Sequence, residues 1–178
     1  MSDLQPRGIS IMIGGVERHL LFTFAAIDII QDHFDRPLIE VIELLKDERT
    51  LYKTAGFIIA TLIQDEIART GSGRGPELME VMRQLDKSMT KRVLKAILRA
   101  YGISLPEPDE EEVEDVDPED IEKLNIARMI YIGTSKLGYT EAEIFQMTPR
   151  KFHLIYEEYL EMNGGTKQDN GGGIDSLP

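Results

Sequence analysis

The chain has 178 residues, 42% hydrophobic and 29% charged, which is typical of one or two globular domains and excludes a collagen-like or wholly disordered protein. No apolar run reaches the ~18–20 residues that cross a bilayer, and the first residues lack the charged-then-apolar order of a signal peptide. The absence of cysteine excludes disulfides, thiolate metal sites and a thiol nucleophile. We therefore expect a protein that stays in the cytoplasm, without contact with a membrane.

The net charge of −12 comes almost entirely from one segment. Residues 1–104 carry 14 acids and 14 bases, whereas residues 105–120 carry 10 acids and no base. Residues 121–178 carry 8 acids and 6 bases. A nucleic-acid-binding domain is usually basic overall, so nucleic acid is not an expected partner.

The first structured segment is predicted to be a β hairpin. Residues 9–13 and 16–23 are rich in β-prone side chains, and Gly14-Gly15 separates them. Glycine enters the positive-φ conformations of a tight two-residue turn without steric cost. Because a two-stranded ribbon is marginal in water, we expect it to lie against helices.

Helical spacing of apolar residues begins at Phe24 and continues to about residue 101. Thr23 is the expected N-cap of the first helix, and Pro37 opens a second. A third is predicted from about Asp47, with a nearly all-apolar middle that is typical of a central core helix. A fourth is predicted to run without a break from Pro76 to about Tyr101.

The rest of the chain divides into a linker, a second module and a tail. Residues 105–120 hold three prolines and a block of like charge, so an extended flexible linker is predicted there. Residues 121–163 have apolar spacing for three short helices. The start signal of the first one, Asp117-Pro118-Glu119-Asp120, lies at the end of the linker. Residues 164–178 are polar and glycine-rich and are expected to be disordered. The predicted fold is therefore mainly α with a small N-terminal hairpin (α+β), in modules 1–104 and 121–163.

No combination of residues specifies an enzyme, and we expect no cofactor, metal or catalytic residue. The glycine-rich loop at 71–75 lacks the ending of a phosphate-binding P-loop and is interpreted as an inter-helix connection. Two sets of side chains could be drawn as metal sites, but neither has a further ligand at a diagnostic spacing. These sets are Asp28, Asp32 and His33, and His153 with Glu157.

Two groups of side chains are candidates for binding a partner. The first is a basic stripe at four-residue intervals, with no acid from 87 to 100: Lys87, Lys91, Lys95 and Arg99, with Arg92 beside them. It is either a solvated face or a surface for acidic groups, of which linker 105–120 is the nearest. The second group gives the C-terminal module more apolar surface than three short helices easily bury: Phe145, Met147, Phe152 and Tyr156.

Residues 138–152, GYTEAEIFQMTPRKF, resemble the C-terminal segment of tail assembly chaperones of long-tailed (siphovirus-type) bacteriophages. In that family a bulky residue, any residue and then Met-Thr-Pro lead into a helix. Phe145 stands where a Trp is common, and Lys151 where an acid is frequent. The layout of the N-terminal half is similar to the same family: a hairpin with Ile13-Gly14-Gly15, then Leu21-Phe22-Thr23 leading into a short helix and a helical bundle.

The resemblance implies a non-enzymatic factor that coats the tape measure protein and recruits tail tube subunits in the cytoplasm of the bacterial host. Such a factor is absent from the mature virion, and it exists in many phages as a short product and a longer, frameshifted one. Self-association is left open. The alternatives are a structural (head-to-tail or tail) component of a phage particle and an acidic cellular regulator.

Overall fold

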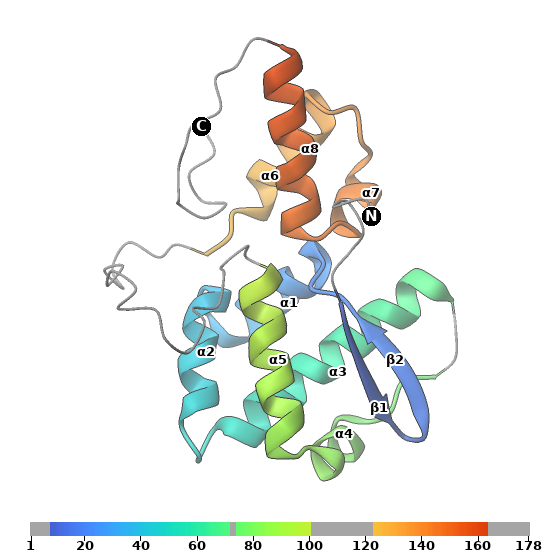
Figure 1. The fold of residues 1–178 in the computed structure, drawn as a ribbon, viewed down its shortest axis with the longest axis vertical. Coiled ribbons are helices and arrows are strands. Elements are labelled where there is room, and N and C mark those ends of the chain that lie inside the picture. Colours follow the sequence, from blue (N-terminus) through green and yellow to red (C-terminus); the bar gives the residue numbers. More distant parts are fainter. Residues whose placement is uncertain (1–7, 72–73, 101–122, 164–178) are drawn as a thin grey trace, which may run out of the picture.

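The computed structural model describes residues 8–71, 74–100 and 123–163 of the chain; for Ile42, Leu94 and 96–100 it describes the backbone only. These residues form one two-stranded sheet and eight helices, which confirms the mainly α class with an N-terminal hairpin (Figure 1). The predicted linker 105–120 and tail 164–178 lie outside the described residues. The elements are β1 (Ile9–Ile13), β2 (Val16–Leu20), α1 (Phe24–Phe34), α2 (Leu38–Lys46), α3 (Leu51–Thr70), α4 (Leu78–Gln84), α5 (Lys87–Ala100), α6 (Ile126–Ser135), α7 (Glu141–Phe145) and α8 (Pro149–Met162).

The hairpin has the predicted Gly14-Gly15 turn. The two strands are antiparallel, with Ile13 opposite Val16 and Ile9 opposite Leu20. Gly14 and Gly15 both have positive φ, 60° and 74°, a backbone conformation that residues with a Cβ adopt only with strain. The alternating isoleucines of β1 are buried while Met12 is exposed, so one face of the ribbon belongs to the core.

Side chains from the helices cap the outer edges of this ribbon. The carbonyl of Ser10 accepts a hydrogen bond from Arg92 of α5. On the other strand, the backbone N–H of His19 donates to Glu66 of α3 at 2.6 Å. Gln84 of α4 accepts from the backbone N–H of Gly14 at 2.9 Å. Unpaired edge groups invite pairing with another strand, and the contacts to Ser10 and His19 occupy one such group on each strand.

The helices α1 to α3 start and end largely where the sequence predicts. Thr23 caps α1 by accepting from the N–H of Ala26, and Asp35 ends that helix in the left-handed conformation. The helix α2 follows Pro37 as expected. Residues 47–50 form a turn ahead of α3, which starts at Leu51, and α3 ends at Gly71 with φ of 68°. Its middle, from Ala55 to Ile63, is almost wholly buried.

The prediction of a single helix from Pro76 to about Tyr101 is wrong. The structure has α4 and α5 instead, separated at Leu85 and Asp86. The carboxylate of Asp86 accepts from the backbone N–H of Met89 at 2.6 Å, and its carbonyl accepts from that of Thr90. An aspartate at an N-cap satisfies N–H groups that a continuous helix would leave to its own backbone, so Asp86 favours a new start.

The C-terminal unit (residues 123–163) has the three predicted helices, but α6 starts later than expected. Asn125 caps it by accepting from the N–H of Arg128, so α6 does not extend back to the predicted start at 117–120, which lies outside the described residues. Leu124 cannot join the helix, because its backbone N–H and C=O are both bonded to the side chain of Gln31. Those contacts connect residues 93 positions apart in the chain.

The C-terminal unit packs on α1, and the two parts of the chain share one hydrophobic core (Figure 1). The N–H of Phe24, the first residue of α1, donates to the carbonyl of Met147 at 2.8 Å. The Phe24 and Phe152 rings make an edge-to-face contact with centroids 5.5 Å apart. Both rings are fully buried, so α1 is covered by residues that follow it by more than a hundred positions.

Candidate interaction surfaces

Within residues 138–152, the segment that resembles the phage chaperones, two helices begin at local N-caps. Thr140 and Glu143 form a reciprocal capping box at α7. The hydrogen bonds that Thr140 donates hold the pKa of the Glu143 carboxyl below its usual range. Thr148 caps α8 by accepting from the N–H of Lys151, and Pro149 occupies the first turn. The phrase is therefore a helix, a tight turn and a new helix, with Met147 at the turn.

Three of the four predicted C-terminal partner-binding residues are parts of the core. Phe152 is 0% exposed, Met147 5% and Tyr156 7%. Phe145 is half-buried against the same core. The structure gives Met147, Phe152 and Tyr156 packing roles and leaves them little surface that a partner could contact.

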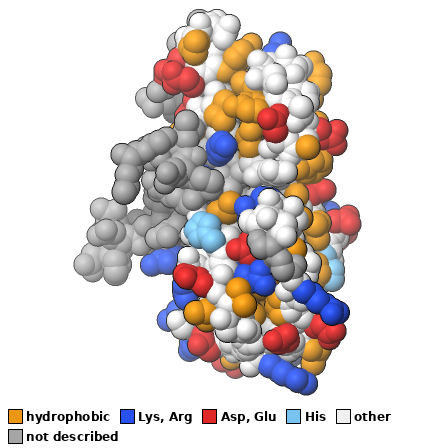
Figure 2. Space-filling model, turned by 90° about the vertical axis from the view of Figure 1, so that its right-hand side faces the viewer, with side chains coloured by type: hydrophobic (Ala, Val, Ile, Leu, Met, Phe, Trp, Pro, Cys, Tyr) orange, Lys and Arg blue, Asp and Glu red, His pale blue; other side chains and the backbone are white. Residues whose placement is uncertain are grey.

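An apolar groove of about 540 Å³ lies on another face of the same unit, between α8 and the α6–α7 connection. Figure 2 shows hydrophobic side chains gathered over the half of the molecule that holds the C-terminal helices. The ring of Tyr159 in the groove stacks on that of Tyr156, with centroids 6.2 Å apart. Met162 at its end is 79% exposed. The lining residues are Lys136, Leu137, Tyr139, Leu154, Ile155, Glu158, Tyr159, Met162 and Asn163.

A signal for this groove was present in the sequence of α8. Phe152 and Tyr156 lie one turn apart and form its buried face. Ile155, Tyr159 and Met162 recur at three- and four-residue steps on a second face. A helix with apolar residues on two faces has more apolar surface than its own unit can bury. The face with Ile155, Tyr159 and Met162 is the one that stays accessible.

The basic residues of α5 lie on its solvent side. Lys87, Lys91, Arg92 and Lys95 are exposed, whereas the side chain of Arg99 is outside the described part. Arg92 is the member with a described contact, to the carbonyl of Ser10. The predicted contact between this stripe and linker 105–120 involves residues that the structure does not describe.

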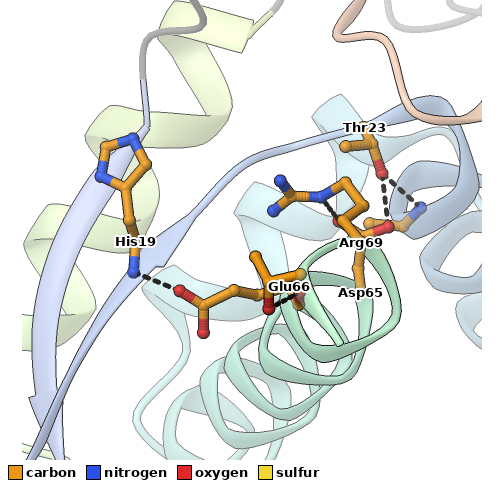
Figure 3. Close-up of polar contacts among 7 residues, drawn as sticks. His19, Thr23, Asp65, Glu66 and Arg69 are labelled. Carbon is orange, nitrogen blue, oxygen red and sulfur yellow. Dashed lines mark hydrogen bonds and ion pairs between the residues drawn. The ribbon is translucent and has the colours of Figure 1, made fainter. Parts of the chain in front are cut away.

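A buried polar cluster connects the hairpin to α3 (Figure 3). Asp65 accepts from Thr23 at 2.9 Å and from Arg69 at 2.8 Å. Glu66 accepts from the His19 N–H and from Arg18, whose side chain is 10% exposed. Each carboxylate is bound to cationic and neutral donors of the protein itself, so the cluster joins elements together.

The two sets of side chains considered for metal binding do not form such sites. Within residues 8–71, 74–100 and 123–163, no three His, Asp or Glu side chains gather closely enough to hold an ion. The ring of His33 stacks on Phe57 with centroids 3.6 Å apart. His153 lies 3.2 Å from Glu157, one turn further along α8.

Among the residues that the structure describes, no helix has both the length and the apolar character needed to cross a membrane. Comparisons with known protein families, with curated proteins and with solved structures return no match to this chain.

Proposed function

We propose that the protein is a non-enzymatic tail assembly chaperone of a long-tailed bacteriophage. In this role it binds the tape measure protein and recruits tail tube subunits in the cytoplasm of the host, and it is absent from the finished virion. The observation that carries the proposal is the accessible apolar groove on the unit that contains the chaperone-like phrase. An apolar groove with a few polar groups at its rim is typical of a site for a protein segment.

The proposed binding face of α8 differs from the face that holds the unit in the fold. The buried face of α8 holds the C-terminal unit to α1 through Phe152. The groove face, with Ile155 and Tyr159, is only partly covered by the protein itself. A partner can therefore occupy the groove without displacing the core. Two attached units that each bind a different partner raise the effective concentration of one partner near the other, as recruitment requires.

The test is co-purification with the tail tube protein and the tape measure protein of the same phage. Met162→Glu places a charge in the groove at a side chain that is 79% exposed, so we expect normal folding and loss of partner binding. Tyr131→Glu is the matched control, because Tyr131 is 67% exposed on α6 and does not line the groove. Equal binding by wild type and Met162→Glu contradicts the proposed site.

Mass spectrometry of purified particles separates this proposal from a structural role. A chaperone is present in lysates during assembly and missing from particles, whereas a head-to-tail or tail component persists in them. A tape measure gene directly downstream supports the chaperone and disfavours an acidic cellular regulator.

A further inference from the structure

The exposed side of α5 carries a single kind of charge. Lys87, Lys91 and Lys95 succeed one another by one helical turn and are all exposed, while Thr90 and Val93 on the opposite side are buried. No Asp or Glu occurs anywhere from residue 87 to residue 100. The helix lies on the outside of the N-terminal bundle, where another molecule can reach it (Figure 1).

Four other bases of the described structure contrast with these lysines. Arg18, Arg69, Lys46 and Lys123 each form an ion pair with a carboxylate. None of the three stripe lysines is ion-paired with another described residue. A solvated helix face usually alternates acids and bases at this spacing, because opposite charges one turn apart attract. The stripe has positive charge that the described fold does not neutralise.

We propose that Lys87, Lys91 and Lys95 form a docking surface for an acidic helix of a partner protein. Successive lysines are about 6 Å apart along the axis, and the three together span about 12 Å. A partner helix with Glu or Asp every four residues repeats that distance, so two nearly parallel helices bring three pairs of opposite charges together. This proposal does not depend on the phage tail function.

Two other classes of partner fit the surface less well. Membrane-binding basic helices insert an apolar face into lipid, but the apolar face of α5 packs on α2, α3 and β1. Nucleic acid is an extended polyanion and would also meet the repulsion of a chain with net charge −12. A short acidic helix needs no free apolar face of α5 and contacts little of the chain apart from the three lysines.

The chain's own acidic segment, residues 105–120, is the alternative occupant of the lysine stripe. Residues 105–120 hold ten acids, but Pro108 and Pro118 interrupt them, and the acids at 109–112 are consecutive. Consecutive acids point to different sides of a helix, and proline breaks a helix interior. Between Pro108 and Pro118, acids four residues apart occur only in pairs, such as Glu111 with Asp115. The segment therefore matches the stripe in charge but has no proline-free run with three acids in register with the three lysines.

The experiment measures binding of a fluorescein-labelled helical peptide, with Glu at every fourth position, to the full chain by fluorescence anisotropy. We expect the triple variant Lys87→Gln, Lys91→Gln, Lys95→Gln to weaken binding at least about tenfold, and 0.5 M salt to do the same, because exposed charges are screened within a few ångströms there. The matched control is Arg49→Gln, Lys53→Gln, Arg83→Gln, which removes three exposed bases elsewhere and should change affinity less than about twofold. Circular dichroism confirms that both variants fold.

Four results overturn the proposal. The first is an equal loss in both triple variants, which reduces the effect to net charge. The second is equal binding of a peptide with the same composition and consecutive acids. The third is tighter, stripe-dependent binding of double-stranded DNA. The fourth is peptide binding only after the acids of 105–120 are changed to amides, which assigns the stripe to the chain's own segment.

Discussion

The N-terminal bundle is joined to the hairpin and to the C-terminal unit by two chemically different interfaces. On the hairpin side, Glu66 receives the Arg18 guanidinium at 3.3 Å and the His19 N–H at 2.6 Å. On the C-terminal side the buried contacts are neutral, with Gln31 bonded to the backbone of Leu124 and Phe24 against Phe152, and the ion pair of Lys123 with Asp35 is exposed. The contacts of Glu66 join residues 47 and 48 positions apart, and the neutral buried contacts join residues 93 or more positions apart. Removing a neutral contact exposes apolar surface or leaves buried backbone groups unpaired, whereas removing a charged one leaves a partner charge unbalanced.

Truncation after Ser104 tests the neutral interface as a whole and has the largest expected effect. The hairpin and α1–α5 retain most of the buried side chains, so we expect a cooperative thermal transition at a lower temperature than that of the full chain. Uncovering Phe24 by itself removes about 1.5–3 kcal/mol of stabilisation. Calorimetry checks this, and a truncated chain without a cooperative transition contradicts independent folding of residues 1–104.

Phe152→Ala is expected to destabilise the protein by about 3–5 kcal/mol, because it removes a fully buried ring that contacts Phe24. Urea unfolding of the full chain measures the loss. Phe145→Ala is the control: its ring is half-buried, so the loss should be clearly smaller. If the two variants lose equal stability, Phe152 does not have the packing role assigned to it.

Gln31→Ala is expected to cost about 2–4 kcal/mol, because it leaves the buried N–H and C=O of Leu124 without their partner. Hydrogen exchange of the Leu124 amide should accelerate more than exchange within α3. The exposed Gln64 provides the control, since Gln64→Ala removes the same side chain with a change within about 0.5 kcal/mol. Unchanged protection of Leu124 would show that Gln31 does not hold the C-terminal unit in place.

Glu66→Gln probes the charged interface and should cost about 1–3 kcal/mol. The amide keeps the shape and an acceptor for His19, but it removes the charge beside the buried Arg18. The Nε of Arg18 is already buried with no hydrogen-bond partner in the described part, so the guanidinium depends on this carboxylate. The additional change Arg18→Met should recover part of the loss, and a purely additive double variant argues against coupling.

The smallest effect is expected at the exposed pair of Lys123 and Asp35, 2.5 Å apart. The hydrogen bond from Lys123, and then its charge, lower the pKa of Asp35. A folded pKa below the unfolded one means that the contribution is present above the unfolded pKa and is lost as the pH falls through the folded pKa. Lys123→Gln should return the pKa of Asp35 toward its ordinary value in a carboxyl NMR titration. An unchanged pKa means that the pair does not persist in solution.

Where the chain itself contains both partners of an interaction within a few residues, the sequence alone was enough to predict the structure. Gly14-Gly15 predicts the hairpin turn, and Thr23, Thr140 and Thr148 predict helix starts, because a cap acts on N–H groups two or three positions away. The break at Asp86 follows the same rule, but the apolar spacing on both sides of it is equally compatible with one continuous helix.

Only the tertiary structure decided which apolar face of α8 is buried and where α6 starts. Phe152 and Tyr159 are both aromatic residues of an amphipathic helix, and the position of Phe24 makes the first a core residue and leaves the second in the groove. Leu124 stays outside α6 because Gln31, far away in sequence, occupies its backbone groups. Such choices depend on contacts between distant segments, and no local propensity encodes which segments will meet.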